Sequence, residues 1–362
     1  MIKSELSFGL VKIKKLNVDL QIELSSLISV LILVCIIVLT GGNGQNPDLR
    51  NYIENYQNVA VIKESIIYTI LVRVCTLRGI SYRWFRMMIY ALGYCTLWKA
   101  SKRFGCNRVI FYLSYAISLM MIDSTQTYNF MGMVFLFNAV SHLVYDEKRN
   151  RTVYVFWVLI AAGFHIVFLF YIPFVFIYQI NDRNLLLKVF KTVIFIMVVL
   201  STVVSVSGLT SVLKGVLSIA GMDDYQSYLL SRTRYGHFFP IIEHLVCCIF
   251  TYYIYQKAAR QDLPSRRIIR ILFLLNLFGI IAFPLFRYQL TIARFTRNLE
   301  LVTFASSAIF IRENRNKYAG LYVAIGMLTI AVVLGYFAVF AEYKDVIVVP
   351  FWKENWLLGG QA

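Results

Sequence analysis

The stretch Leu24–Tyr56 joins an apolar run, LSSLISVLILVCIIVLT (Leu24–Thr40), to a polar one, GGNGQNPDLRNYIENY (Gly41–Tyr56). A helix needs about 20 mostly apolar residues to span a bilayer, with a range of about 17–25, so the first run predicts a membrane span. In the second run Asn46 can cap a helix, Pro47 suits its first position, and Asp48 suits the positive end of its dipole. Asp48, Tyr52 and Tyr56 recur every fourth residue, which would place them on one helix face. The alternative interpretation is a solvated loop followed by an ordinary surface helix.

The composition indicates an all-α, polytopic integral membrane protein. Of 362 residues, 59% are hydrophobic, 16% are aromatic and only 15% are charged, which is too apolar for a soluble domain. The formal net charge of +17 fits the excess of Lys and Arg in cytoplasmic loops. No basic patch with interleaved aromatic residues favours nucleic acid as a partner. The cysteines form no C-x-x-C pair, and we interpret them as small core residues.

The distribution of basic residues predicts the orientation of the chain. The N-terminal segment 1–23 carries Lys3, Lys12, Lys14 and Lys15, which predicts a cytoplasmic N-terminus and an uncleaved signal-anchor helix. Gly41–Tyr56 would then lie outside. Val61–Leu77 has a polar stripe of Ser65, Thr69 and Arg73, so we expect an interfacial or re-entrant helix there. If that helix spanned the membrane, the basic loops would fall outside.

If Val61–Leu77 does not span the membrane, hydropathy and the positive-inside rule predict about eleven spans in a single membrane domain. The outer segments are 41–83 (outer loop and interfacial helix), the large loop 207–236 and the C-terminal tail 341–362. The run Thr152–Ile180 suits two short helices that turn near Gly163–His165. The expected spans are Leu24–Thr40, Trp84–Trp98, Val109–Ile122, Phe130–Tyr145, the two helices of Thr152–Ile180, Leu185–Val206, His237–Tyr255, Ile271–Pro284, Leu290–Ile311 and Tyr318–Phe340.

Several arginines fall on the outer side despite the positive-inside rule. Arginine forks suit phosphate oxygens, so this excess predicts an anionic ligand such as a lipid diphosphate. The alternative is that some of them reach lipid headgroups or pair with Asp and Glu. In Leu290–Ile311, Arg297 and Glu300 can neutralise each other. The outer arginines are Arg50, Arg73, Arg78, Arg83, Arg86, Arg232, Arg234, Arg287 and Arg294.

The histidines predict no metal site. His237 and His244 are seven residues apart, about 10.5 Å along a helix, which is too far to chelate one ion. His165 follows the sequence AAGF at the expected outer turn and has the chemistry of a general base, although a buried histidine bonded to a carbonyl is the alternative. No nucleotide-binding loop, G-x-S-x-G elbow or H-E-x-x-H motif occurs.

The order of these features resembles the EpsG/Wzy-type family of polysaccharide polymerases. Asp48 followed by Tyr52 is similar to the family's Asp-x-x-x-Tyr signature, and Phe130–His165 is similar to its central block. Arg294 lies where the family has an arginine, and Val349-Pro350-Phe351 resembles its C-terminal ending. Two positions depart from the family: Asn129-Phe130 stands where Arg-Gln is frequent, and Asn298 stands where Tyr is common.

The resemblance implies a glycosyltransferase of the bacterial cytoplasmic membrane that needs no metal or other cofactor. It would transfer a growing glycan from undecaprenyl diphosphate to the terminal sugar of another lipid-linked repeat unit, and so make O-antigen, capsule or exopolysaccharide. Asp48 or His165 would be the base. Tyr52 and Tyr56 would contact sugar, and Arg50, Arg232, Arg234, Arg287 and Arg294 would bind the diphosphate. The implied partners are the undecaprenyl-diphosphate-linked oligosaccharide, the lipid bilayer, and a chain-length regulator and flippase of the same pathway.

Two other functions remain open at this point. A flippase or transporter of the lipid-linked oligosaccharide would use the same arginines without a base, but the paired broken helices typical of transporters are not evident. A membrane O-acyltransferase that modifies the glycan would require a cytoplasmic site for the acyl donor. The inner loops are short, which does not favour such a site.

Overall fold

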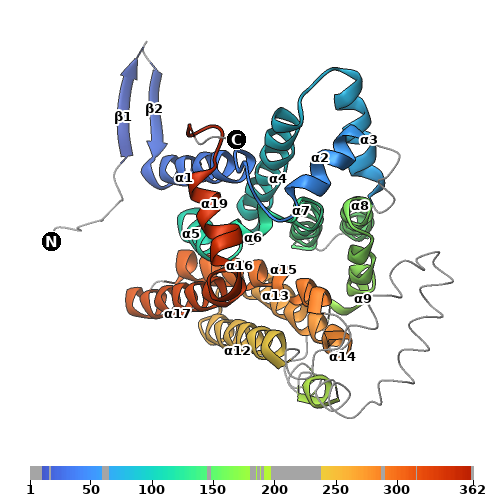
Figure 1. Ribbon diagram of the computed structural model, residues 1–362. Coiled ribbons are helices and arrows are strands. Elements are labelled where there is room, and N and C mark those ends of the chain that lie inside the picture. The colour runs from blue at the N-terminus through green and yellow to red at the C-terminus, as the bar shows by residue number, and fades with distance from the viewer. Residues whose placement is uncertain are drawn as a thin grey trace. The chain divides into compact units, whose positions relative to one another are not determined.

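The computed structural model describes residues 10–15, 18–58, 65–144, 148–179, 185, 188, 191–196, 238–286, 290–314 and 316–359. These residues group into two compact units. The first unit comprises Met1–Ile172 with Ser307–Ala362, and the second comprises Pro173–Ser306. The elements of both are labelled in Figure 1. Apart from one N-terminal hairpin the described chain is helical, as predicted.

The first span is confirmed as a helix, α1 (Leu24–Gly41). It packs against α4 (Tyr82–Phe104) and α5 (Arg108–Ser118), and α5 packs against α17 (Lys317–Gly335). Before α1, strands β1 (Leu10–Lys15) and β2 (Val18–Glu23) form an antiparallel hairpin in which Leu10 pairs with Glu23 and Lys15 with Val18. This hairpin, at the upper left of Figure 1, was not predicted from the sequence.

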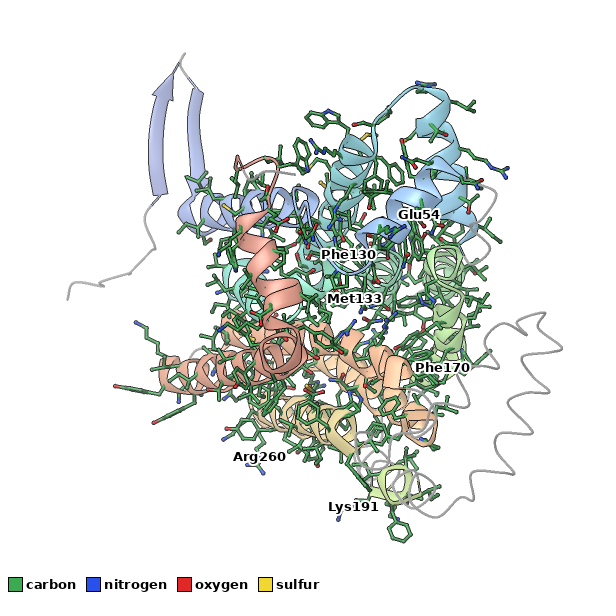
Figure 2. The ribbon with its side chains drawn as sticks, viewed as in Figure 1. Glu54, Phe130, Met133, Phe170, Lys191 and Arg260 are labelled. Carbon is green, nitrogen blue, oxygen red and sulfur yellow. The ribbon has the colours of Figure 1, made fainter. Side chains whose placement is uncertain are left out.

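The centre of the first unit is α7 (Thr127–His142), which lies between α4 and α8 (Lys148–Phe164). Every residue of α7 except Tyr128 and His142 is buried. Phe130, labelled in Figure 2, stacks on Tyr90 of α4 with ring centroids 5.1 Å apart. A short helix, α6 (Met120–Asp123), precedes α7, and a sharp turn joins the two.

Two short helices follow the first span. Helix α2 covers Leu49–Gln57 and α3 covers Ile66–Leu77. With 12 residues, α3 is shorter than the about 20 residues that a span needs, and the interfacial or re-entrant placement of Val61–Leu77 stays a prediction. Its Tyr68, Val72 and Cys75 face the protein, whereas Ile66, Ile70 and Val74 are exposed.

The predicted break near His165 is confirmed. Helix α8 ends at Phe164, His165 adopts an extended conformation, and the 3-10 helix η2 (Ile166–Tyr171) follows. After Pro173 the chain continues into the second unit with α9 (Phe174–Ile177). Thr152–Ile180 therefore holds short helical pieces and no single long span.

In the second unit α12 (Phe238–Arg260) packs along α13 (Arg266–Gly279), and α13 also contacts α9 and α15 (Arg294–Asn298). The remaining short elements of this region are η4 (Ile280–Ala282), α14 (Phe283–Phe286) and η5 (Leu290–Ala293). Helix α16 (Glu300–Glu313) begins in the second unit and ends in the first. The predicted span Leu185–Val206 and the loop 207–236 lie almost entirely outside the described residues.

The predicted C-terminal tail is mostly helical. Helix α17 continues through the π-helical turn η6 (Tyr336–Phe340), α18 (Ala341–Tyr343), η7 (Lys344–Val348) and α19 (Val349–Lys353). Val339, Ile347 and Val348 pack on Ile122 of α6. Figure 1 shows α19, in red, beside α1, and the two helices are in contact.

The segment Gly41–Asn46, here named the junction loop, receives the end of the chain. Gly44 N donates to Glu354 O at 2.7 Å, and Trp356 N donates to Gly42 O at 3.0 Å. The side-chain amide of Asn355 donates to Val38 O and Leu39 O at 3.2 and 3.1 Å. The C-terminal segment and the junction loop therefore lie at the same end of α1.

Apolar side chains cover the outside of several helices at helical spacing. Within the described part of the chain, three helices are long and apolar enough to cross a membrane, Phe238–Arg260, Arg266–Phe286 and Lys317–Phe340, and shorter apolar helices include Ser25–Gly41. Exposed apolar stripes are typical of lipid-facing surfaces, which supports an integral membrane protein. The count of about eleven spans and the orientation stay predictions. The exposed stripes include Leu27, Leu31 and Val34 of α1, Trp84, Met88 and Leu92 of α4, Ile242, Val246 and Ile249 of α12, and Leu321, Ile325 and Val332 of α17.

The packing of the junction loop predicts that Gly42→Ala destabilises the protein. A Cβ at Gly42 would overlap Asn355 Oδ1 and lie 2.6 Å from Val38 O, and such overpacking costs about 1–3 kcal/mol. We expect a lower unfolding midpoint for the purified protein in detergent. The matched control is Gly320→Ala in α17, where a Cβ would meet nothing within 4 Å. Equal midpoints for the two variants would contradict the described contact between the junction loop and Asn355.

Candidate functional site

Helix α2 begins two residues later than the sequence predicted. Asn46 Oδ1 accepts from Asp48 N at 3.1 Å, and Asn46 O accepts from Leu49 N at 3.1 Å. Asn46 therefore closes a turn ahead of the helix, and Asp48 itself occupies the N-cap position. The prediction that Asn46 caps the helix directly is wrong, because Pro47 and Asp48 complete this turn first. Asp48 is half-buried, and its side chain makes no capping hydrogen bond.

Tyr52 and Tyr56 share one face of α2, as predicted, and that face is turned into the protein. Their exposed fractions are 7% and 6%. The ring of Tyr52 meets Tyr128 edge-on at 5.0 Å, and Tyr128 in turn meets Tyr68 of α3 at 4.5 Å. The Tyr56 hydroxyl donates to Ile80 O at 2.6 Å. Protein covers both rings here, and their sugar contacts stay a prediction.

Arg86 lies in the interior beside this face. The side chain is 3% exposed, although it sits in a predicted span, where a charged residue costs about 2.5–3.5 kcal/mol. Its Nη2 donates to Ser124 O at 2.6 Å and to Thr40 O at 3.2 Å, and its Nε reaches Thr40 O at 3.4 Å. The guanidinium also lies 5.4 Å from the Tyr90 ring centroid. Arg86 thus joins the end of α1, the first turns of α4 and the turn after α6.

Asp123 is the buried carboxylate of the same region, with no exposed surface. Its Oδ2 accepts from the Tyr115 hydroxyl at 2.9 Å, and that hydroxyl lies 3.0 Å from the Tyr94 hydroxyl. The Tyr90 hydroxyl donates to Asp123 O at 2.9 Å. These contacts connect Asp123 to the turn that Arg86 holds. The buried polar group of Arg86, Tyr90, Tyr94, Tyr115, Asp123 and Ser124 is named the Arg86 cluster below.

Tyr52 interacts electrostatically with both Asp48 and Arg86. Burial raises the pKa of the Tyr52 phenol well above its usual range, and nearby groups that include Asp48 add to the shift. The Arg86 guanidinium interacts electrostatically with Tyr52 as well. Because this phenol keeps its proton across the physiological pH range, Tyr52 can donate a hydrogen bond and cannot serve as a base. A half-buried carboxylate and a buried guanidinium thus both interact electrostatically with one protonated phenol.

His165 lies at the break between α8 and η2 and is half-buried. Its N–H donates to Ala161 O at 3.0 Å, and its ring centroid is 6.3 Å from that of Phe168. Two residues earlier, Gly163 O accepts from the Ser65 hydroxyl at 3.2 Å. The His165 turn is therefore docked on the first turn of α3, the helix that also carries Tyr68.

The predicted arginines fall in different places. Arg50 is 88% exposed on the outward side of α2 and pairs with Glu54 at 2.8 Å; Glu54 is labelled in Figure 2. Arg294 is half-buried and opens α15 in the second unit. Arg232, Arg234 and Arg287 lie outside the described residues. The structure thus groups Asp48, Tyr52 and Tyr56, and the diphosphate-binding role of these five arginines stays a prediction.

A model of the EpsG family matches residues 24–348. The chain belongs to the EpsG family. This family is linked to exopolysaccharide biosynthesis, and the match runs from the first residue of α1 to the last residue of η7. A search of curated proteins and a search of solved structures returned no match.

The second unit of this EpsG protein has a polar cluster of its own. His244 Nε2 lies 2.7 Å from Asn276 O, and Asn276 Nδ2 donates to Thr251 Oγ1 and Thr303 Oγ1 at 2.9 and 3.0 Å. His244 is thus a buried histidine that meets a backbone carbonyl. Arg297 interacts electrostatically with Glu243 of α12, a pairing that sequence spacing did not predict. Among the described residues no group of three or more His, Cys, Asp or Glu side chains is placed to hold a metal ion.

Sequence reasoning missed most of the Arg86 cluster. Arg86 was one of many outer arginines, and Asp123 fell between the expected spans Val109–Ile122 and Phe130–Tyr145 without an assigned role. A carboxylate at the end of an apolar run, close to buried tyrosines, was the available signal. The sequence could not show the partners of Arg86, because these are backbone carbonyls 46 and 38 residues away.

The Asp123 contacts predict a specific cost for Tyr115→Phe. The change removes the hydroxyl that donates to Asp123 Oδ2, and weakening the solvation of a buried carboxylate costs about 1–3 kcal/mol. We expect a lower unfolding midpoint in detergent. Tyr318→Phe, at an exposed position of α17, is the matched control and should unfold like the wild type. A Tyr115→Phe midpoint equal to that of the control would show that Tyr115 does not support Asp123.

Proposed function

We propose that this EpsG protein is a polysaccharide repeat-unit polymerase that acts on undecaprenyl-diphosphate-linked oligosaccharide at the outer face of the cytoplasmic membrane. The observation that carries the proposal is the position of Asp48. In a chain of a family linked to exopolysaccharide biosynthesis, this half-buried carboxylate stands at the start of α2, and the buried Tyr52 interacts electrostatically with both Asp48 and Arg86.

The reaction needs a base and a stabilised leaving group. The acceptor hydroxyl oxygen attacks the anomeric carbon of the growing glycan, and its proton passes to Asp48. The bond from that carbon to the diphosphate oxygen breaks, and undecaprenyl diphosphate leaves with the electron pair. The departing charge requires positive groups placed in advance. Arg294 is the described candidate on the second unit, and Arg232, Arg234, Arg287 and Arg50 are the others.

Asp48 is preferred to His165 as the base because of its surroundings. Tyr52, which keeps its proton, can donate to an acceptor sugar or to the carboxylate, and so orient the proton transfer. His165 is the alternative base, and the test below includes it. A flippase or an O-acyltransferase requires no base at Asp48, so each of these functions predicts a different product pattern.

The deciding experiment is the glycan profile of a strain in which the gene is deleted and then complemented. We expect the deletion to leave single lipid-linked repeat units without a ladder of longer chains. Asp48→Asn should give the same pattern, because loss of a general base slows a reaction by about 10²–10⁴-fold. Arg294→Ala should shorten the ladder, and His165→Ala should keep it if Asp48 is the base.

The matched control is Asp262→Asn. Asp262 is 80% exposed and pairs with Arg266, and its positive φ of 49° is a conformation that Asn tolerates. This variant should give a full ladder. Long chains in the deletion strain that lack only a substituent would point to an acyltransferase. Repeat units confined to the cytoplasmic face would point to a flippase, and either result would refute the polymerase.

A further inference from the structure

Arg108 is fixed in place by neutral groups at the start of α5. It is the first residue of that helix and is half-exposed. Its guanidinium carbon lies 4.1 Å from the ring centroid of Trp98, and its Nη2 donates to Ser26 Oγ at 3.0 Å. Among the described residues no Asp or Glu side chain pairs with it. These contacts orient the guanidinium and leave its positive charge without a counter-charge.

A second guanidinium lies beside the loop that joins α4 to α5. Arg312 is exposed in the last turn of α16, and a Cβ at Gly105 of this loop would lie 3.3 Å from its Nη1. Arg312 also has no carboxylate partner in the described part of the chain. Both Arg108 and Arg312 interact electrostatically with the thiol of Cys106. Two like charges so placed repel each other unless an anion lies near both.

The surrounding helix ends add to the positive potential. Helix α5 has no acidic residue in its first turn, so the positive end of its dipole acts together with Arg108. Lys99 and Lys102 are exposed near the end of α4. The surface formed by Lys99, Lys102, Arg108 and Arg312 is named the basic patch. Such a surface attracts anions.

The basic patch lies at the level expected for lipid headgroups. Ser26, which Arg108 contacts, is in the first turn of α1, at the opposite end of that helix from the junction loop. The 18 residues of α1 span about 27 Å, close to the thickness of about 30 Å of the hydrocarbon core. The exposed apolar side chains of Leu27 and Leu31 begin next to Ser26, and Leu113 of α5 is exposed as well. Tryptophan, here Trp98, is typical of this level.

We propose that the basic patch binds the phosphate group of an anionic phospholipid, with Arg108 and Arg312 as its ligands. Guanidinium forks match phosphate oxygens, and basic surfaces between membrane helices bind such headgroups. The acyl chains of the lipid lie along the exposed apolar side chains of α1 and α5. The inference does not rest on the proposed function, because the patch and Asp48 belong to opposite ends of α1.

The test is lipid binding to the purified full-length protein in a neutral detergent, measured by native mass spectrometry. The probes are dioctanoylphosphatidylglycerol, which is anionic, and dioctanoylphosphatidylcholine, which is zwitterionic. We expect the wild type to bind the anionic lipid more tightly. Each arginine near a membrane surface contributes about fivefold to such binding, so Arg108→Gln and Arg312→Gln should each raise the Kd of the anionic lipid by about that factor.

Two further variants separate this site from general surface charge. Arg108→Lys keeps the charge but loses the fork and the planar contact with Trp98, so its Kd should lie between those of the wild type and Arg108→Gln. Arg260→Gln, at an exposed position in the last turn of α12, makes the same change in net charge and should bind as the wild type does. Because Arg312 is exposed, Arg312→Gln tests the site even if Arg108→Gln does not fold.

The outcomes that would overturn the proposal are distinct. Equal affinity of the wild type for the two lipids, or a wild-type Kd in Arg312→Gln and in folded Arg108→Gln, would overturn the site. The same loss of affinity in Arg260→Gln would reduce it to general surface charge. Binding of glycerol 3-phosphate as tight as that of phosphatidylglycerol would show a site for free phosphate. Tighter binding of a polyglutamate peptide would assign the patch to an acidic protein segment and so refute the phospholipid.

Discussion

The hydrogen bonds from Arg86 to the carbonyls of Thr40 and Ser124 are the constraint on which the first unit depends. They join the end of α1, the start of α4 and the turn before α7, three segments far apart in the sequence. A helix end leaves its last carbonyls without partners, and at Thr40 the guanidinium satisfies one of them. Because the junction loop begins at Gly41, this bond also fixes where the loop leaves α1. The position of Asp48 follows from it, since the turn closed by Asn46 comes directly after the loop.

The C-terminal segment also donates hydrogen bonds to the end of α1. Asn355 donates to Val38 O and Leu39 O, so two more carbonyls at the end of α1 gain partners. Asn43 Nδ2 donates to Ser124 Oγ, which ties the junction loop to the turn that Arg86 holds. The polar interactions of this region therefore satisfy a helix end in an apolar chain, where each unpaired backbone group is costly. These contacts position the carboxylate that we propose as the general base, and proton transfer depends on such positioning.

The sequence predicted those features that depend on local spacing. The shared face of Tyr52 and Tyr56, the short helix α3 and the break at His165 all follow from periodicity or from run length. Features that depend on distant partners could not be read in this way. Nothing local shows that Arg86 finds carbonyls of Thr40 and Ser124, that Arg297 meets Glu243 of α12, or that Asn355 returns to α1. The N-terminal hairpin was not predicted, because segment 1–23 was assessed only by its positive charge. The EpsG resemblance was recognised from short motifs and is confirmed by the family match over residues 24–348.

The central claim, that the chain joins lipid-linked repeat units, is tested most directly in proteoliposomes that contain only the purified protein and a synthetic lipid-diphosphate repeat unit. New glycosidic bonds and released polyprenyl diphosphate should be measured in the same sample. We expect glycans of several units and one released lipid diphosphate for each bond formed, without added nucleotide sugar or acyl donor. Repeat units that cross the bilayer unchanged, with no release of lipid diphosphate, would contradict polymerisation and identify a transporter.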